Sequence, residues 1–135
     1  RELAVERGRA SSRRIIEITD SEGADATVER LVRHALAEHD DIEAVYSIGG
    51  GNTGVVDAFA REGRRCRVFV GHDLDVDNRS LLRSGALSAV LHHDLRSDAR
   101  RACRILMQAR GELDGVESER TPIQILTRFN MPHRA

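Results

Sequence analysis

The sequence has few aromatic residues, no lysine and only two cysteines. Aromatic residues make up 3% of its 135 residues, so it offers few faces on which a sugar ring or a base could stack. Cys66 and Cys103 lack CxxC spacing, which argues against a disulfide scaffold and predicts two buried, reduced thiols. The 21 basic residues, all arginine, are interspersed with 22 acids. The basic residues therefore form no continuous stripe, and their distribution does not indicate that this segment binds nucleic acid.

Long apolar runs are also missing. No run approaches the roughly 18 to 20 apolar residues that cross a bilayer, and no basic-then-apolar leader is visible. We therefore expect no membrane span and a cytoplasmic location. The chain begins at Arg1 rather than at methionine, so we expect it to be part of a longer protein. Its 40% hydrophobic content and net charge of −1 are typical of one globular domain, or part of one, over residues 1–135.

Short β-rich runs alternate with amphipathic segments, which is typical of βα units on a parallel sheet. Residues 1–8 look like the tail of a helix. Strands are expected at 14–19, 43–48, 67–71, 89–91 and 123–127, and helices at 25–39, between the glycines at 49–54 and Gly63, at 76–83 ending before Gly85, and at 94–109. This order predicts an α/β fold with an open, doubly wound, mostly parallel sheet and helices on both of its faces.

Two of the expected helices carry their apolar residues on one face, and that of the first should face the sheet. The helix at 25–39, with Asp25 as its expected N-cap, has the stripe Val28, Leu31, Val32, Ala35 and Leu36. The stripe of the helix at 94–109 is Leu95, Ala99, Ala102, Cys103 and Leu106.

Ligands of doubly wound sheets bind beyond the carboxyl ends of the strands, which selects the residues that follow each strand. Asp73 could accept paired hydrogen bonds from vicinal hydroxyls, or it could be a helix cap or loop acid. Asn52 offers both a donor and an acceptor, which suits polyols, but it could instead cap the next helix. His92 and His93 should present opposite faces, and His93, nearer the tip, is the expected ligand contact.

Other chemistries remain open at the same edge. A metal could be held by residues among His72, Asp73 and the run 92–94, although no HxH or HxxxH pair on one element forms such a site in advance. The glycines at 49, 51 and 54 satisfy GxGxxG between a strand and a helix, with Asp73 about 20 residues further on, as in dinucleotide-binding folds. A complete strand and helix precede this motif, however, and no substrate domain follows it. There is no GxSxG elbow, and neither cysteine lies beside a histidine at a strand tip, so we expect no enzyme and no cofactor.

The run from Ile42 to Phe59, which contains Ser47-Ile48-Gly49-Gly50-Gly51-Asn52-Thr53-Gly54, resembles the second-lobe motif of type I periplasmic-binding folds. It is most similar to the version in regulators of the lactose-repressor (LacI/GalR) family. The resemblance continues through Val70-Gly71-His72-Asp73 and the run from Leu82 to Asp94, and covers about residues 14–130. It implies that Asn52, Asp73 and His93 hold sugar hydroxyls, with Gly51 and His72 beside them. His93 replaces the glutamine common in the family, the triple glycine makes the tip roomier, and the usual Gly-Phe pair of the first helix is missing.

The resemblance further implies a two-lobed clamp, of which this chain is mainly the carboxyl-terminal lobe. The amino-terminal lobe and the DNA-binding helix-turn-helix would lie outside it. A sugar or polyol effector would close the hinge and shift a homodimer between DNA-binding states. The single lobe should bind ligand weakly and expose an apolar side that self-associates. The same fold also serves ABC importers as solute receptor, which is the alternative, with an NAD-binding fragment as the second. The run from Ile125 to Pro132 is similar to the end of regulator chains, and so favours the regulator.

Overall fold

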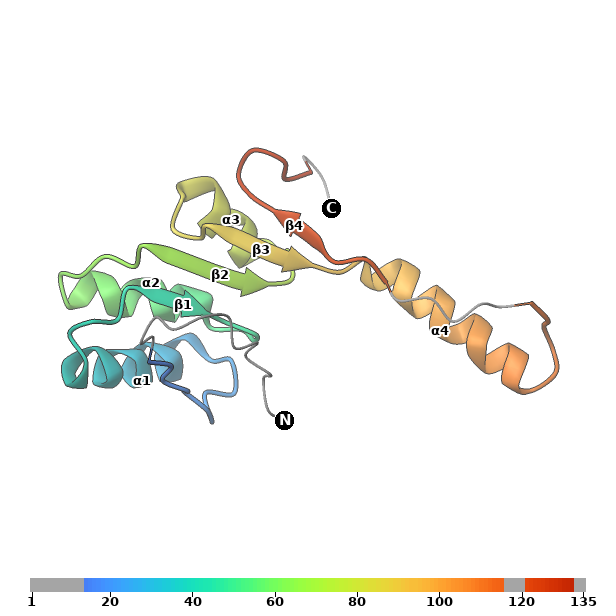
Figure 1. Cartoon of the computed structure of the whole chain (residues 1–135), viewed down its shortest axis with the longest axis horizontal. Coiled ribbons are helices and arrows are strands. Elements are labelled where there is room, and N and C mark those ends of the chain that lie inside the picture. The colour runs from blue at the N-terminus through green and yellow to red at the C-terminus, as the bar shows by residue number, and fades with distance from the viewer. Residues whose placement is uncertain (1–13, 116–120, 133–135) are drawn as a thin grey trace.

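The computed structural model describes residues 14–115 and 121–132 as an α/β fold (Figure 1). The elements follow one another as α1 (Asp25–Glu38), β1 (Ala44–Tyr46), α2 (Asn52–Arg61), β2 (Val68–His72), α3 (Val76–Ser84), β3 (Ala89–His92), α4 (Leu95–Ala109) and β4 (Gln124–Leu126). The strands of this described part lie in the order β1-β2-β3-β4. The first two pairings are parallel and the β3–β4 pairing is antiparallel. The predicted α/β class with a mostly parallel sheet is confirmed, and β4 adds an antiparallel edge.

The strand expected at 14–19 does not form, and that prediction is wrong. Residues 14–20 have no strand pairing, and Ile15 and Ile18 are exposed. A β-rich run becomes a strand only where a neighbouring strand accepts its backbone hydrogen bonds, and this run has no such neighbour. It contacts instead the loop between α1 and β1, where the Arg14 guanidinium donates to Asp41 Oδ1 at 2.8 Å. The helix tail expected at 1–8 lies outside the described residues.

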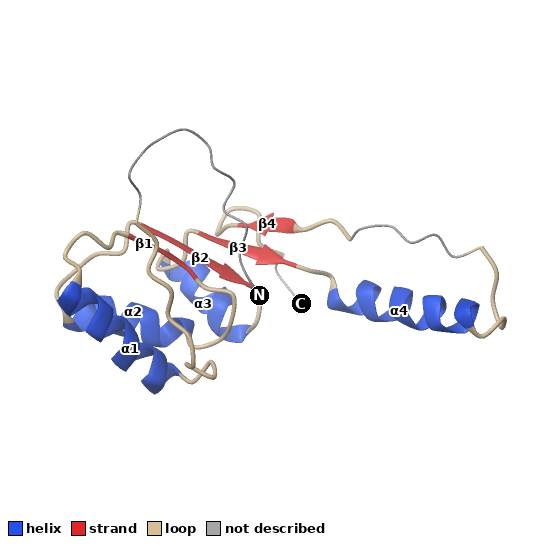
Figure 2. Ribbon diagram, turned by 60° about the horizontal axis from the view of Figure 1, so that its bottom comes forward, coloured by secondary structure: helices blue, strands red, loops and turns tan. Residues whose placement is uncertain are grey.

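The helices α1, α2 and α3 lie together on one side of the sheet (Figure 2). Alternate strand residues point toward them, as the two-residue period of a strand requires. The apolar stripe predicted for α1 is confirmed except for Leu31, which is only partly buried. The core beneath the sheet is formed by Val28, Val32, Leu36, Val55, Ala58, Phe59, Phe69, Leu74, Leu82, Leu87, Val90 and Leu126.

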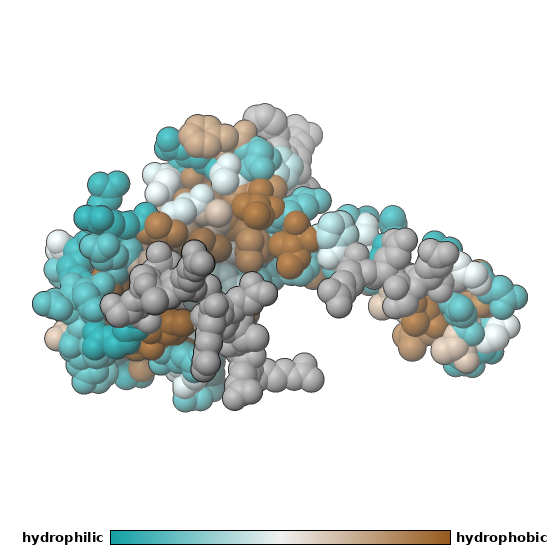
Figure 3. Space-filling view, viewed as in Figure 1, coloured by the Kyte–Doolittle hydropathy of each residue, from teal (hydrophilic) through white to brown (hydrophobic). Residues whose placement is uncertain are grey.

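The other face of the sheet is open in the part of the chain that the structure describes. Tyr46 and Val68 are each 49% exposed there, and Ile125 is 63% exposed. In the space-filling view, hydrophobic side chains gather over β2, β3 and β4 (Figure 3). The second helical layer that a doubly wound sheet requires is therefore not present among the described residues.

Helix α4 extends away from the sheet rather than covering it (Figures 1 and 2). None of its residues is buried, so α4 does not provide the helical layer that a doubly wound sheet would have on its second face. The chain leaves the carboxyl end of β3, runs outward through α4, and returns at the same edge, because antiparallel β4 places Gln124 opposite His92. Cys103 on α4 is exposed and Cys66 is half-buried, so the prediction of two buried thiols is also wrong, although both are free. No helix in residues 14–115 or 121–132 has the length and apolar character of a membrane span.

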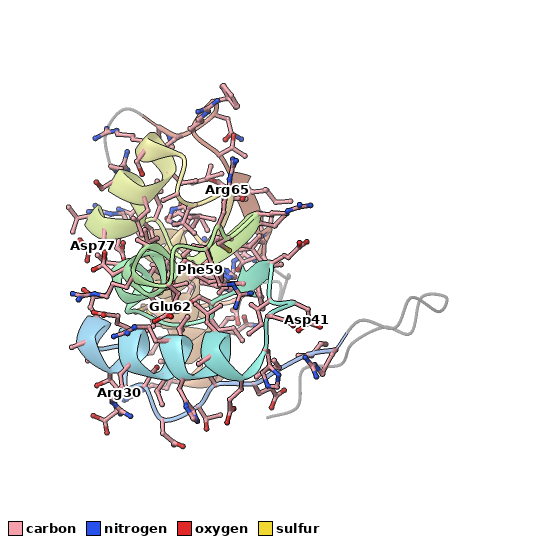
Figure 4. The ribbon with its side chains drawn as sticks, turned by 90° about the vertical axis from the view of Figure 1, so that its left-hand side faces the viewer. Arg30, Asp41, Phe59, Glu62, Arg65 and Asp77 are labelled. Atoms are coloured by element: carbon pink, nitrogen blue, oxygen red, sulfur yellow. The ribbon has the colours of Figure 1, made fainter. Side chains whose placement is uncertain are left out.

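The contact between α1 and α2 is reinforced by charged side chains at its rim. Phe59 points into the core, and Glu62 lies at the α1–α2 boundary (Figure 4). The Arg33 guanidinium donates to Glu62 Oε1 at 2.7 Å. The Arg64 guanidinium donates four hydrogen bonds of 2.8–2.9 Å to backbone carbonyls of residues 36–42, at the end of α1 and in the turn after it. Arg64 thereby satisfies carbonyl groups that a helix end leaves without internal partners.

Candidate functional site

The glycine loop between β1 and α2 packs against the start of α1. Gly51, the residue before α2, has the left-handed φ of 80°, and a Cβ placed on it would lie 2.4 Å from Val28 Cγ2. A Cβ on Gly54 would lie 2.1 Å from the Asp25 carbonyl oxygen. The prediction that Asp25 is the N-cap of α1 is wrong, because Ala24 holds that position. The Asp25 carboxylate instead accepts a hydrogen bond from the Gly54 amide at 3.3 Å. Glycine at 51 and 54 is thus required by the packing of two helices.

The dinucleotide interpretation of this loop also needs a particular topology. Dinucleotides bind where the strand order of the sheet reverses. Across the described strands the order is consecutive, and β1, which leads into the glycine loop, lies at the edge of that sheet. The GxGxxG spacing is therefore present here without the strand order that accompanies it in dinucleotide-binding folds.

Asn52, the first residue of α2, is 4% exposed and points under β2 rather than out of the fold. Its side-chain amide donates to Asn78 Oδ1 at 2.7 Å, and a Cβ on Gly71 of β2 would lie 3.2 Å from its Nδ2. Asn52 does not cap α2. Its Oδ1 is buried and has no hydrogen-bond partner among the described residues. A buried amide oxygen of this kind is an acceptor that awaits a donor.

Asp73 lies in the turn between β2 and α3, in a left-handed backbone conformation with φ of 59°. Asp73 does not cap α3, because the N-cap is Asp75, whose carboxylate accepts from the Asn78 backbone amide at 2.7 Å. The Asp73 amide donates to the Leu91 carbonyl at 2.9 Å, which ties the turn to β3. Its Oδ1, like that of Asn52, is buried without a partner in the described part of the chain.

The histidines of this edge differ in what they contact. His72 Nε2 lies 2.6 Å from Tyr46 Oη, and the two rings meet edge to face at the ends of β2 and β1. His92 Nδ1 accepts from the Leu74 amide at 3.2 Å, on the side of the helices. His93 follows β3, is half-buried, and accepts through its carbonyl from the Leu95 amide.

The structure therefore brings Asn52, His72 and Asp73 together through Asn78, with Gly51 next to Asn52 along the chain. His93 lies on the same edge, but no hydrogen bond in residues 14–115 and 121–132 joins its ring to that group. Sequence reasoning missed Asn78 and Tyr46. Asn78 could have been found, because it lies four residues before Leu82 on the stripe of α3 that faces the core.

Carboxylates dominate the charge at this edge. Asp73, Asp75 and Asp94 follow β2 and β3, and the pKa of the Asp94 carboxyl is lowered by hydrogen bonds from the Ser97 hydroxyl and amide. Over the described ranges, no group of three or more histidine, cysteine, aspartate or glutamate side chains is close enough to hold a metal ion. Acceptor oxygens at this edge suit a ligand that donates hydrogen bonds.

Known structures share this fold. A glucose-galactose binding protein from Geobacillus stearothermophilus superimposes with a TM-score of 0.74 at 18% identity, over 88% of this chain and 43% of that one. An ABC transporter solute binding protein from Agrobacterium vitis with bound D-fucose gives 0.69 at 17% identity, over 85% and 40%. An arabinose binding protein from Geobacillus stearothermophilus gives 0.62 at 16% identity, over 82% and 42%.

This chain therefore spans about two fifths of the length of these proteins. No protein-family model matches the sequence, and no curated protein matches it either. At these identities the likeness concerns the fold. The chain shares the α/β fold, with its mostly parallel sheet, of these sugar-binding proteins.

Proposed function

We propose that this chain forms most of one lobe of a protein that binds a small sugar or polyol without transforming it. The observation that carries the proposal is the pair of buried oxygens, Asn52 Oδ1 and Asp73 Oδ1, that have no donor within the described residues at the carboxyl edge of the sheet. An unpaired buried acceptor costs about 1–3 kcal/mol, and ligand hydroxyls supply the missing donors. Both oxygens are shielded from solvent, so the hydroxyl reaches them after side chains at the edge rearrange or through a bridging water.

The remaining contacts of this site are assigned from their position. Gly51 lets the backbone of the glycine loop approach α1 beside Asn52, and the ring of His72 is already paired with Tyr46. His93 stands at the end of β3, where its ring can donate or accept. Asp73 contributes the negative charge that makes its hydrogen bonds to hydroxyls strong.

Helix α4 supports a two-lobed arrangement. A helix of 15 residues is marginal in water by itself, and none of the residues of α4 is buried. Helix α4 begins directly after β3 at the ligand edge, and antiparallel β4 places Gln124 opposite His92 at that same edge. In this proposal α4 packs on a second lobe across that edge.

The finer assignment is the sensing lobe of a homodimeric, cytoplasmic transcriptional regulator similar to the lactose-repressor family. It rests on the motifs at 42–59, 70–73 and 82–94 and on the terminal run from Ile125 to Pro132. DNA binding would belong to another part of the protein. The structural neighbours favour a second candidate, the sugar receptor of an ABC importer, since such receptors are among the proteins with this fold.

Titration calorimetry on the full-length protein tests the proposal. D-glucose, D-galactose, D-fucose and D-arabinose are the first probes, with NAD as the control ligand. Saturable binding of a sugar, but not of NAD, is the expected result, and absence of binding to sugars and polyols would sink both candidates. DNA from upstream of the gene then separates them, because a regulator binds it with an affinity that changes with sugar, whereas a receptor does not bind it.

A further inference from the structure

The most connected buried polar side chain of the described fold is Asn78 on α3. It is 1% exposed, and all of its hydrogen-bonding groups are used. Its backbone amide donates to Asp75, its Nδ2 donates to the carbonyls of His72 and Asp73 at 2.8 Å each, and its Oδ1 accepts from Asn52. One side chain thus joins the start of α2, the end of β2 and the start of α3.

This set of contacts allows only one orientation of each amide. The two carbonyls of His72 and Asp73 can only accept, so Asn78 must turn its NH₂ toward them. Its oxygen then faces Asn52, which must turn its own NH₂ inward. The Asn52 oxygen is consequently the group left over, and it is the one without a partner in the described residues. The orientation of Asn78 therefore determines which atom of the Asn52 amide is left to accept a hydrogen bond.

The same side chain also holds the turn that carries Asp73. A left-handed conformation costs a residue with a side chain about 1 kcal/mol or more, and Asp73 adopts it with φ of 59°. Hydrogen bonds from Asn78 to the carbonyls on both sides of this residue's Cα fix that turn. His92 supports it from β3 through the Leu74 amide.

We infer that Asn78 is a positioning residue of the site at the carboxyl edge of the sheet. It orients two acceptor oxygens, those of Asn52 and Asp73, toward the hydroxyl donors of the ligand. This inference rests on the proposed sugar-binding function. Asn78 does not touch the ligand; it acts by fixing the polarity of one contact residue and the backbone of the other.

The test uses full-length protein and three variants. Asn78→Leu removes every side-chain hydrogen bond of Asn78 at similar volume, and Asn78→Asp keeps the acceptor for Asn52 but loses the donors to the turn. Leu82→Val is the matched control, because it loosens the same buried face of α3 without touching the polar contacts. Calorimetry measures the Kd of whichever of the four sugars the wild type binds most tightly, at a temperature where every variant is folded, and amide exchange is followed at residues 73 and 74.

The inference predicts at least a tenfold increase in Kd for Asn78→Leu and a smaller increase for Asn78→Asp. Both variants should exchange the amides of residues 73 and 74 at least tenfold faster, while Leu82→Val, with a comparable loss of Tm, stays within twofold of wild type in both measurements. Equal effects of Leu82→Val and Asn78→Leu, or wild-type affinity in Asn78→Leu, would overturn the inference. If wild type binds no sugar, the proposed function fails, and the exchange rates alone still decide whether Asn78 holds the turn.

Discussion

Replacing Gly54 by alanine tests the packing of the glycine loop. The added Cβ would lie 2.1 Å from the Asp25 carbonyl oxygen, 2.9 Å from the Asp25 carbonyl carbon and 3.0 Å from the Glu29 backbone nitrogen. All three are backbone atoms of α1. To reach ordinary van der Waals contact the first of these distances must grow by about 1.3 Å, and close-packed interiors transmit such a shift to the whole helix pair. The substitution therefore forces α1 away from α2.

The expected magnitude follows from two opposing effects. Overpacking against side chains costs about 1–3 kcal/mol, and backbone cannot turn aside as a side chain can, so we take about 3 kcal/mol as the lower bound for separating the helices. Alanine in place of glycine within a helix recovers about 1 kcal/mol. The net loss in the free energy of unfolding should be about 2 kcal/mol or more, measured by urea denaturation followed by circular dichroism.

Gly49→Ala is the matched control in the same loop, because a Cβ there meets no atom within 4 Å. Its free energy of unfolding should stay within about 0.5 kcal/mol of wild type, as for most unconstrained surface positions. If Gly54→Ala is as stable as Gly49→Ala, the close approach of α1 and α2 is wrong. The packing explanation of the GxGxxG spacing would then be wrong with it.

Three further outcomes are expected. Arg64→Met should lower the free energy of unfolding by about 2–3 kcal/mol, because charge-assisted hydrogen bonds to four carbonyls are lost. The control Arg67→Met breaks only the exposed ion pair with Glu43, at 3.6 Å, and should change the free energy of unfolding by less than about 0.5 kcal/mol. Hydrogen bonds from Ser97 at the start of α4 lower the pKa of the Asp94 carboxyl in the folded chain. These hydrogen bonds therefore stabilise α4 fully above about pH 4, and the stabilisation is lost as the pH falls through the lowered pKa of Asp94. Amide shifts of α4 should show this step in wild type and not in Asp94→Ala. Burial raises the pKa of the Cys66 thiol, so at pH 8 iodoacetamide should modify exposed Cys103 faster than Cys66, as mass spectrometry of the peptides would show; equal rates would contradict this.

The helix α1 and the central strands could be predicted because their local patterns agree with their surroundings. The stripe from Val28 to Leu36 has one face, and that face meets the core. The strands β2 and β3 read as apolar runs that end in polar residues, and parallel pairing brings those ends to one edge. The class of the fold and the position of Asp73 follow from these features alone.

Other features depend on parts of the molecule that no local pattern specifies. The stripe on α4 correctly indicates a helix with one apolar face, but periodicity does not say which surface covers that face. The run at 14–19 has strand propensity and no neighbouring strand to pair with. Asn78 was missed because an asparagine in a helix reads as a solvent-facing residue, whereas its role arises from three segments that meet only in the folded chain.

The central claim is that the carboxyl edge of this sheet binds sugar hydroxyls, and calorimetry of wild type and Asp73→Ala full-length protein tests it most directly. A charged hydrogen-bond acceptor contributes about 1.5–3 kcal/mol, so the variant should bind the same sugar about 10- to 100-fold more weakly, with little change in Tm when no ligand is present. Unchanged sugar affinity in Asp73→Ala would contradict the assignment of this edge. Binding of NAD in place of any sugar would make the glycine loop a dinucleotide site instead.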